Sequence, residues 1–373
     1  MSEFFDVAVV GGGLAGSCAA ILLAQSGIRV VLLEGAVVGR HKVCGEFLSP
    51  ESRVQLRQLE VLIALQHVGA RNVTRARVCT SAQQGRSIPL SGEGLAVSRA
   101  TLDTVLWKRA LEAGVDARDQ SRVTRIEPSE GGFTLSTPQE EVHARFVLSA
   151  TGRGAKWGRD SDEHFVPHQR FVGLKTHFQG ARTERGEVAL FPFAGGYCGL
   201  VEVENGRTNA CLLAPYSRLK NSSPSALWAE IRSENQALNS AVGDGRPLFE
   251  WKATGNVSFS QFAPVHEGIL RVGDAAGYIH PLSGDGMAMA LRSGELAART
   301  LEQAVRRRWP RNKTERVYST MWKNEFSTRL RWAGVLQPLF CDARFSNVAL
   351  RVFDLFPALS SLAVKGTRGR STP

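Results

Sequence analysis

The sequence predicts an α/β protein in which parallel-strand units flank an inserted, sheet-rich domain, with a helical region at the C-terminal end. Three observations predict this fold. The chain opens with a strand, a glycine-rich turn and a helix, and residues 160–262 alternate between apolar and polar positions. A strand, a Gly-Asp turn and another helix then follow at residues 269–291. A chain of 373 residues is long enough for such intertwined domains.

Residues 5–34 predict a Rossmann-type β-α-β unit. An apolar strand leads into GGGLAG, an apolar helix follows, and a second strand ends in Glu34. Gly11 makes the tight turn, Gly13 lets a pyrophosphate approach the helix N-terminus, and Gly16 permits close helix–strand packing. Glu34 accepts from ribose hydroxyls and its charge disfavours a 2′-phosphate. The unit therefore suits FAD or NAD better than NADP.

The polar loop GRHKVCGEFLSPES at residues 39–52 carries Cys44 and Glu46. Three basic residues precede the cysteine, and basic neighbours make a thiol more reactive. On this interpretation Cys44 faces a substrate, with Glu46 as a second polar group of the pocket. A small cysteine buried in the loop is the alternative, and the residues alone leave both open.

The middle of the chain alternates between helices and strands. Residues 54–65 predict one helical stretch, and an amphipathic helix begins near Arg99. A cation at a helix start opposes the helix dipole and invites an anion such as a phosphate, whereas a surface arginine is the alternative. We expect strands at residues 73–80, 85–90, 122–137 (with a turn at Gly131 and Gly132), 141–149, 171–178, 187–193, 197–203 and 208–214, and a helix at 223–234.

The stretch GDAAGYIHPLSGDGMAMAL, residues 273–291, predicts a second ligand-facing turn. Gly273 lets the backbone approach a ligand closely, and Asp274 is an acceptor suited to ribityl or ribose hydroxyls. Gly284 and Gly286 lead into a helix that we expect to run to about residue 307. Its N-terminal N–H groups and dipole favour negative charge, as a reduced flavin requires.

Two further polar residues of this stretch have open roles. His280 is an acid near the pocket or a structural hydrogen-bonding group, and Asp285 is a pocket residue or a helix N-cap.

Composition narrows the class of protein. The 46 Lys and Arg residues exceed the 35 acidic residues, which gives a net charge of +11, but no basic helix accompanies the excess, so we expect no nucleic-acid binding. The six cysteines form no C-x-x-C pair, which argues against a metal site or a disulfide framework. Reduced thiols, no signal-peptide pattern and no apolar run of membrane-spanning length predict a cytoplasmic protein without a transmembrane helix.

The apolar C-terminal region has three open interpretations: an amphipathic helix on a membrane surface, a cap over an apolar pocket, or core packing. Its apolar residues before Pro357 are Phe340, Phe345, Val348, Leu350, Val352, Phe353, Leu355 and Phe356.

The GGGLAG turn, Arg99 at a mid-chain helix start and GDAAG near Gly273, in this order, resemble the FAD-dependent oxidoreductases of the aromatic-hydroxylase (p-hydroxybenzoate hydroxylase-like) fold. Within that superfamily, KVCGEFLSP resembles the geranylgeranyl reductase-like branch. The branch contains double-bond reductases as well as monooxygenases acting on lipophilic or polyketide substrates. The resemblance covers about residues 5–300.

The resemblance implies a Rossmann-type FAD-binding domain (GR2-like) with an inserted β-sheet substrate domain and a C-terminal helical region. It implies that Gly11, Gly13, Gly16 and Glu34 hold the ADP half of FAD, and that Arg99 approaches the pyrophosphate or ribityl chain. Asp274, next to Gly273, binds the ribityl or pyrophosphate region, and the isoalloxazine is bordered by Pro281, Gly284, Gly286 and Met287. We place the FAD-binding segments at 1–75, 97–160 and 263–305, substrate-domain strands at 76–96, the substrate-binding β-sheet domain at 161–262 and a helical cap at 306–373.

Two departures from the superfamily bear on function. Thr151-Gly152 stands where the hydroxylases carry Asp-Gly, which questions direct reduction by NADH or NADPH and admits an electron-donor protein as a partner. The W-x-W-x-I-P signature of flavin halogenases is absent, which argues against halogenation.

We therefore expect a flavin monooxygenase acting on a lipophilic or aromatic small molecule such as a polyketide. The alternatives are a reductase of an isoprenoid or other double bond, and a non-catalytic flavin-binding partner or protein-maturation factor. The candidate catalytic residues are Cys44, Glu46 and His280.

Overall fold

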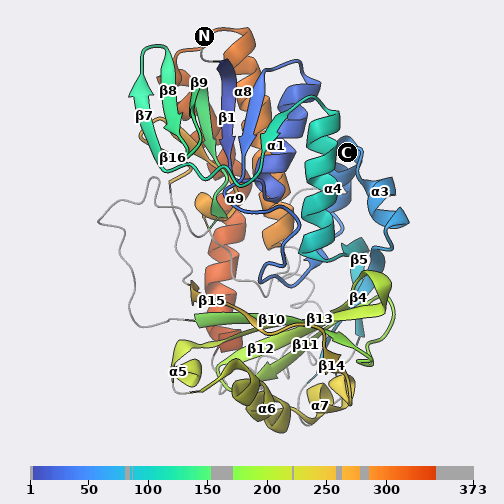
Figure 1. Cartoon of the computed structure of the whole chain (residues 1–373). Helices are drawn as coiled ribbons and strands as arrows, with labels where there is room; N and C mark the ends of the chain where they lie inside the picture. Colours follow the sequence, from blue (N-terminus) through green and yellow to red (C-terminus); the bar gives the residue numbers. More distant parts are fainter. Residues whose placement is uncertain are drawn as a thin grey trace.

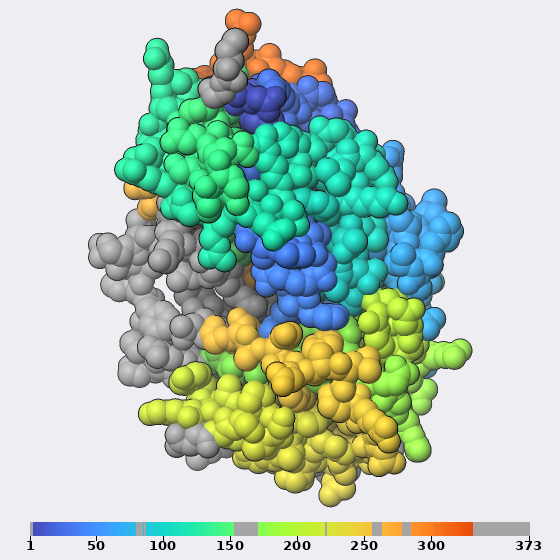
Figure 2. Space-filling model, in the orientation of Figure 1, coloured from blue at the N-terminus to red at the C-terminus, as the bar shows by residue number. Residues whose placement is uncertain are grey.

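The computed structural model describes residues 3–79, 85, 87–152, 171–220, 222–257, 263–277 and 285–341, without the side chains of 256, 257 and 331–341. Two sheets organise the described residues, one above the other in Figure 1. The upper sheet and its helices form the Rossmann domain, and the lower sheet and its helices form the sheet domain. In the space-filling view of Figure 2, the Rossmann domain and the sheet domain lie directly against each other.

The sheet of the Rossmann domain is built around parallel strands. β1 lies between β2 and β9, parallel to both, and β17 extends the sheet in parallel beyond β9. Its strands are, in spatial order, β16 (Val265–His266), β17 (Ile269–Arg271), β9 (Glu141–Ser149), β1 (Phe4–Val10), β2 (Val30–Leu33) and β6 (Asp116–Arg118). β8 (Gly132–Ser136) also pairs with β9, and β7 (Arg125–Ser129) pairs with β8.

The sheet domain is mostly antiparallel, and its short helices cover the face that points away from the Rossmann domain (Figure 1). Its strands are, in spatial order, β14 (Arg246–Pro247), β10 (Phe171–Gln179), β13 (Arg207–Pro215), β12 (Gly196–Glu202), β11 (Glu187–Phe193), β4 (Arg71–Val78), β5 (Ser87–Ala96) and β3 (Phe47–Leu48), with β15 (Lys252–Val257) beside β10. The covering helices are α5 (Tyr216–Leu219), α6 (Pro224–Glu234) and α7 (Gln236–Val242), and η2 (Glu204–Gly206) precedes β13.

Helices α1 (Leu14–Gln25) and α8 (Gly286–Arg306) pack closely together in the Rossmann domain. Gly294 permits this contact, because a Cβ at that position would lie 2.4 Å from the Ala15 carbonyl oxygen. The remaining helices of the domain are α2 (Ser52–Gln58), α3 (Leu62–His67), α4 (Arg99–Glu112), the short η3 (Gly273–Ala275) and α9 (Arg311–Cys341).

Helix α9 runs from the Rossmann domain down toward the sheet domain (Figure 1). Its Tyr318 hydroxyl donates to the Arg271 carbonyl oxygen at 2.6 Å, and Trp322 and Phe326 are buried. The apolar residues from Phe345 to Phe356 lie outside the described residues. None of the described helices has the length and apolar character needed to span a membrane.

Several expected elements are confirmed. The hairpin of β7 and β8 turns at Gly131, α4 starts at Arg99, and α8 ends at Arg306. The single helical stretch expected at residues 54–65 is wrong: α2 and α3 are separate helices, and Glu60 between them has a left-handed φ of 60°. No helix continues through that conformation.

Candidate functional site

Two glycines of the glycine-rich segment after β1, Gly11 and Gly16, leave no room for a side chain. Gly11 has φ +109°, and a Cβ there would lie 2.4 Å from the Ala150 carbonyl oxygen. A Cβ on Gly16 would lie 1.9 Å from the Gly11 carbonyl oxygen. Gly13 is the N-cap of α1, so no capping side-chain oxygen accepts from the N-terminal N–H groups of the helix.

A carboxylate, from Glu34, and a guanidinium, from Arg99, lie beside this turn. The Glu34 carboxylate accepts from the Gly12 N–H at 2.9 Å and from the Ala36 N–H at 3.0 Å. On the other side, Arg99 Nη2 lies 3.8 Å from the position of a Cβ on Gly13. A bare helix N-terminus between a carboxylate and a guanidinium fits a ligand with hydroxyls at one end and a pyrophosphate beside it.

The Arg99 guanidinium is held by a buried carboxylate. Asp103, one turn further along α4, accepts from Arg99 Nε and Nη2 at 3.0 Å each and from Lys42 Nζ at 2.8 Å. Burial, the largest single effect, would lower the pKa of Arg99, but the charges and hydrogen bonds of Asp103 and Cys44 together outweigh it and raise that pKa. Burial likewise opposes ionisation of Asp103, yet Arg99 and Lys42 hold its pKa below 3.8. Arg99 is therefore a fixed, permanently charged group at the turn.

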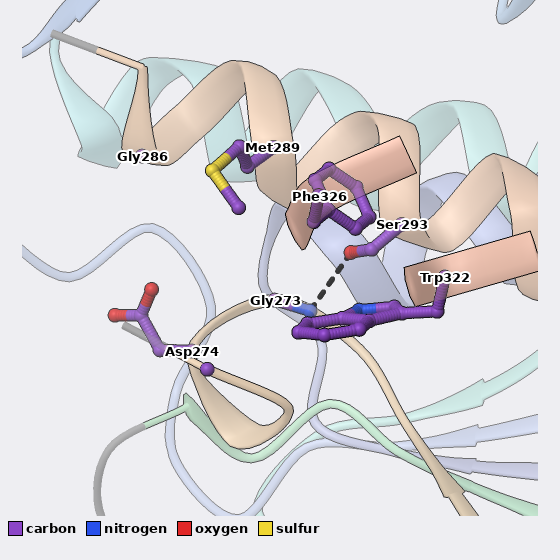
Figure 3. A pocket seen from close by; sticks show the side chains of 8 residues that line it. Gly273, Asp274, Gly286, Met289, Ser293, Trp322 and Phe326 are labelled. Atoms are coloured by element: carbon purple, nitrogen blue, oxygen red, sulfur yellow. Dashed lines mark hydrogen bonds between the residues drawn. The ribbon is translucent and has the colours of Figure 1, made fainter. Parts of the chain in front are cut away.

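The second half of the site lies at η3, beneath α8 and α9. Gly273 has φ +60°, and its N–H donates to Ser293 Oγ at 2.8 Å. Figure 3 shows this hydrogen bond, with the Asp274 carboxylate pointing away from the Trp322 ring. The pocket here is lined by Gly273, Asp274, Gly277, Gly286, Met289, Ser293, Trp322 and Phe326. The sequence did not single out the two aromatic residues, which come from α9.

Helix α8 begins at the far side of this pocket. Asp285 occupies its N-cap position without a side-chain capping hydrogen bond, so the capping role considered for it is not observed. The next two residues, Gly286 and Met287, open the helix, and Met287 is almost fully buried. Three predicted site residues, His280, Pro281 and Gly284, lie outside the described residues.

The Cys44 loop reaches the start of α8. Cys44 Sγ lies 3.6 Å from Met287 Sδ and accepts from the Glu46 backbone N–H at 3.4 Å. The thiol is partly exposed rather than fully buried. It therefore stands beside the helix N-terminus that the sequence predicts for the flavin, between the two domains.

Glu46 is fully buried, and both of its carboxylate oxygens have partners. Oε1 accepts from Lys175 Nζ and from the Arg99 backbone N–H at 2.6 Å, and Oε2 lies 2.7 Å from His177 Nε2. Burial by itself raises the pKa of Glu46, but the hydrogen bond from His177 and the charge of Lys175 hold it below 4.5. Glu46 is thus an ionised, fully bonded carboxylate, without an oxygen turned to solvent.

Lys175 and His177, both fully buried on β10, were not found from the sequence. The segment reads as an apolar strand, and both of its faces are buried. The signal present in the sequence is a lysine and a histidine two residues apart, which places both side chains on one face of a strand.

His41 completes this polar cluster. Its ring stacks on Phe249 with centroids 4.4 Å apart and meets His177 edge-on at 5.0 Å. Burial first, and the charge of Lys175 second, lower the pKa of His41 below 6.5. His41, Glu46 and His177 offer donor atoms within 4.8 Å of one another, a set suited to a divalent cation. The Lys175 ammonium on the same carboxylate opposes such an ion by charge.

Comparison with known proteins places this arrangement among flavoproteins. The profile of the family described as FAD binding domain matches residues 5–312. The chain is 27% identical over 366 residues to digeranylgeranylglycerophospholipid reductase 2 of Methanopyrus kandleri, covering 91% of this chain and 87% of that protein. It is 26% identical over 341 residues to the menaquinone reductase of Mycobacterium tuberculosis, covering 82% and 78%.

A solved structure extends the likeness to three dimensions. The flavin-dependent brominase Bmp2 superposes with a TM-score of 0.81 over 98% of this chain and 93% of that chain, at 17% sequence identity. At that identity the superposition shows a shared fold and nothing more. The fold class expected from the sequence, an FAD-binding Rossmann-type domain combined with a sheet domain, is confirmed.

Proposed function

Since the chain belongs to the FAD binding domain family and is an FAD-dependent oxidoreductase, we propose that it reduces carbon–carbon double bonds in the prenyl chains of a lipophilic substrate. One observation carries the proposal: the similarity to a digeranylgeranylglycerophospholipid reductase runs through 91% of this chain. It therefore includes both domains and the Cys44 loop between them. The menaquinone reductase is a second relative named as a reductase of a lipophilic molecule.

The residues of the chain suit such a reaction. When bound and reduced, FAD supplies a hydride to one carbon of the double bond. The other carbon needs a proton, and Cys44 is our candidate donor, because its thiol is partly exposed at the start of α8. The thiolate left behind regains a proton from water. Glu46 is a poor donor, since it is ionised and both of its oxygens are engaged.

This proposal reverses the order of the expectations drawn from the sequence. The monooxygenase expected first has weaker support, because the halogenase likeness is a likeness of fold alone. The non-catalytic flavin-binding partner is set aside, since the two relatives described above, which share most of the chain, are reductases. The electron donor, whether NADH, NADPH or a protein, stays open, and so do the cytoplasmic location and contact with a membrane surface.

The test is a product analysis of the purified flavoprotein. Protein with FAD is reduced by dithionite, NADH or NADPH in separate anaerobic samples and mixed with a geranylgeranyl phospholipid in detergent. Mass spectrometry should find two hydrogen atoms gained per reduced double bond. A parallel set of the same samples is run in air. A product that gains an oxygen atom, and only in this aerobic set, would overturn the reductase in favour of a monooxygenase. Turnover with NADH or with NADPH identifies that nicotinamide as a donor, and turnover with dithionite alone indicates a donor protein.

A further inference from the structure

We infer that Lys175, His177 and Asn209 of the sheet domain are positioning residues, which hold the Cys44 thiol against the start of α8 by clamping the strained residue Glu46 and the two carbonyls before it. The catalytic meaning of this clamp rests on the proposed function. The contacts that form the clamp do not depend on that function.

The first support is the backbone of Glu46. Its φ of 56° is left-handed, a conformation that a residue with a side chain seldom adopts unless its surroundings impose it. Here the surroundings impose it through the side chain: Lys175, His177 and the Arg99 N–H all donate to the Glu46 carboxylate. The Glu46 carbonyl oxygen in turn accepts from the Val97 N–H at 3.2 Å.

The second support is Asn209, which is fully buried on β13. Its Nδ2 donates to the Cys44 carbonyl oxygen at 3.1 Å and to the Gly45 carbonyl oxygen at 2.9 Å. In the sheet, His177 pairs directly with Asn209, and Lys175 stands two residues from His177 on β10. The three side chains therefore share one face of the sheet, the face on which the Cys44 loop lies.

The clamp determines where the thiol is. Cys44 Sγ accepts from the N–H of Glu46, the residue whose conformation is imposed, and touches Met287 at the start of α8. The Arg99 side chain is a third partner of Cys44. Releasing Glu46 or the two carbonyls would free the thiol from the Glu46 N–H and from Met287. The reacting group would then come from the loop between the two domains, and Lys175, His177 and Asn209 of the sheet domain would aim it.

The test measures the loop directly and needs no substrate. Cys44 alkylation by iodoacetamide is followed by peptide mass spectrometry, together with hydrogen–deuterium exchange of residues 39–52. The variants Lys175→Met and Asn209→Leu should each speed both processes at least several-fold, while FAD content stays unchanged. Lys252→Met is the matched control, because Lys252 is exposed and pairs with Lys175 across β10 and β15. Glu60→Gly controls for relief of a left-handed glutamate elsewhere.

A buried charge without its partner can unfold a protein, so a second set of variants guards against that result. Glu46→Gln combined with Lys175→Met removes both charges together and should also release the loop. His177→Gln keeps a donor for Glu46 and should retain slow alkylation, whereas His177→Leu should not. Unchanged alkylation and exchange in the folded double variant and in Asn209→Leu would overturn the clamp. One equivalent of a divalent ion in purified protein, lost in His177→Leu, would overturn the role given to Lys175.

The two proposals fail separately. If the variants release the loop but wild-type protein reduces no prenyl lipid, the clamp stands and the proposed function falls. If wild-type protein reduces the lipid and the released variants keep the same kcat, Cys44 needs no positioning and the catalytic meaning of the clamp falls. Support for both is a fall in kcat, with little change in KM, that follows the alkylation rate across the variants.

Discussion

The sulfur atoms of Cys44 and Met287 lie 3.6 Å apart, although 243 residues separate them in the sequence. The contact joins the loop after β2 to the first turn of α8. The sequence predicts that the loop faces the substrate and that the start of α8 borders the flavin, and the structure places the two side by side. The candidate proton donor and the candidate flavin helix are therefore parts of one site.

Replacement of Cys44 tests its chemistry. We expect Cys44→Ala to keep its FAD and its melting temperature but to lose about 100-fold or more of its prenyl-lipid turnover, the usual scale for a lost general acid. Cys79→Ala is the control for turnover, since Cys79 belongs to the apolar core of the sheet domain. Full turnover in Cys44→Ala with normal flavin content would return this cysteine to a packing role.

Two glycines of one turn should respond in opposite ways. Gly13 has φ −80°, and a methyl group added there would meet no heavy atom nearer than 3.8 Å, so Gly13→Ala should fold with an unchanged melting temperature. The methyl group would nevertheless occupy the α1 N-terminus, and FAD should be lost on gel filtration. Gly16→Ala should fold poorly, because its Cβ would lie 1.9 Å from the Gly11 carbonyl oxygen. Flavin absorbance and thermal melts measure both effects, and full FAD occupancy in Gly13→Ala would contradict the assigned site.

The free energy of unfolding should decrease in two stages as the pH is lowered. The pKa of His41 is lowered in the folded protein, by burial and by Lys175, His177 and Arg207 against the opposing charge of Glu46. The unfolded chain therefore binds more protons below pH 6.5, and stability decreases there. The lowered pKa of Glu46 adds a second loss below 4.5, as the carboxylate that holds Lys175 and His177 becomes protonated.

Urea unfolding between about pH 7.5 and pH 5 isolates the first stage. His41→Phe preserves the stack on Phe249 but cannot titrate, so its stability should be flat over that range. An equal fall in the wild type and in His41→Phe would assign the loss to other groups.

The hydroxyl of Tyr318 tests how α9 is fastened to the Rossmann sheet. Tyr318→Phe removes the buried hydrogen bond to the Arg271 carbonyl oxygen and should cost about 1–3 kcal/mol of unfolding free energy. FAD content should not change, because neither group lines the pocket. Tyr216→Phe, at an exposed tyrosine, is the matched control and should melt like the wild type.

The parts of the site that the sequence predicted are those with local patterns. The GGGLAG turn and Glu34 belong to one β-α-β unit, so their spacing alone places them together. Arg99 was identified as a cation at the wrong end of a helix dipole, and Asp103 at i+4 explains how that charge is kept there.

The parts that sequence analysis missed depend on pairing between distant segments. Lys175 and His177 meet Glu46 only because β10 faces a loop about 130 residues earlier in the chain. Trp322 and Phe326 reach the pocket because α9 crosses from one domain toward the other (Figure 1). Neither the apolar pattern of a strand nor that of a helix specifies which distant partner it covers.

The order of the strands has a consequence for how the flavoprotein is made. β17 and η3, which supply Gly273 and Asp274, come after the whole sheet domain in the chain, yet β17 pairs with β9 in the same sheet as β1. During translation the whole sheet domain is therefore synthesised before all the segments of the dinucleotide pocket are present. FAD would therefore bind late in biosynthesis, because the glycine-rich turn after β1 is synthesised long before η3, which supplies the other part of the pocket.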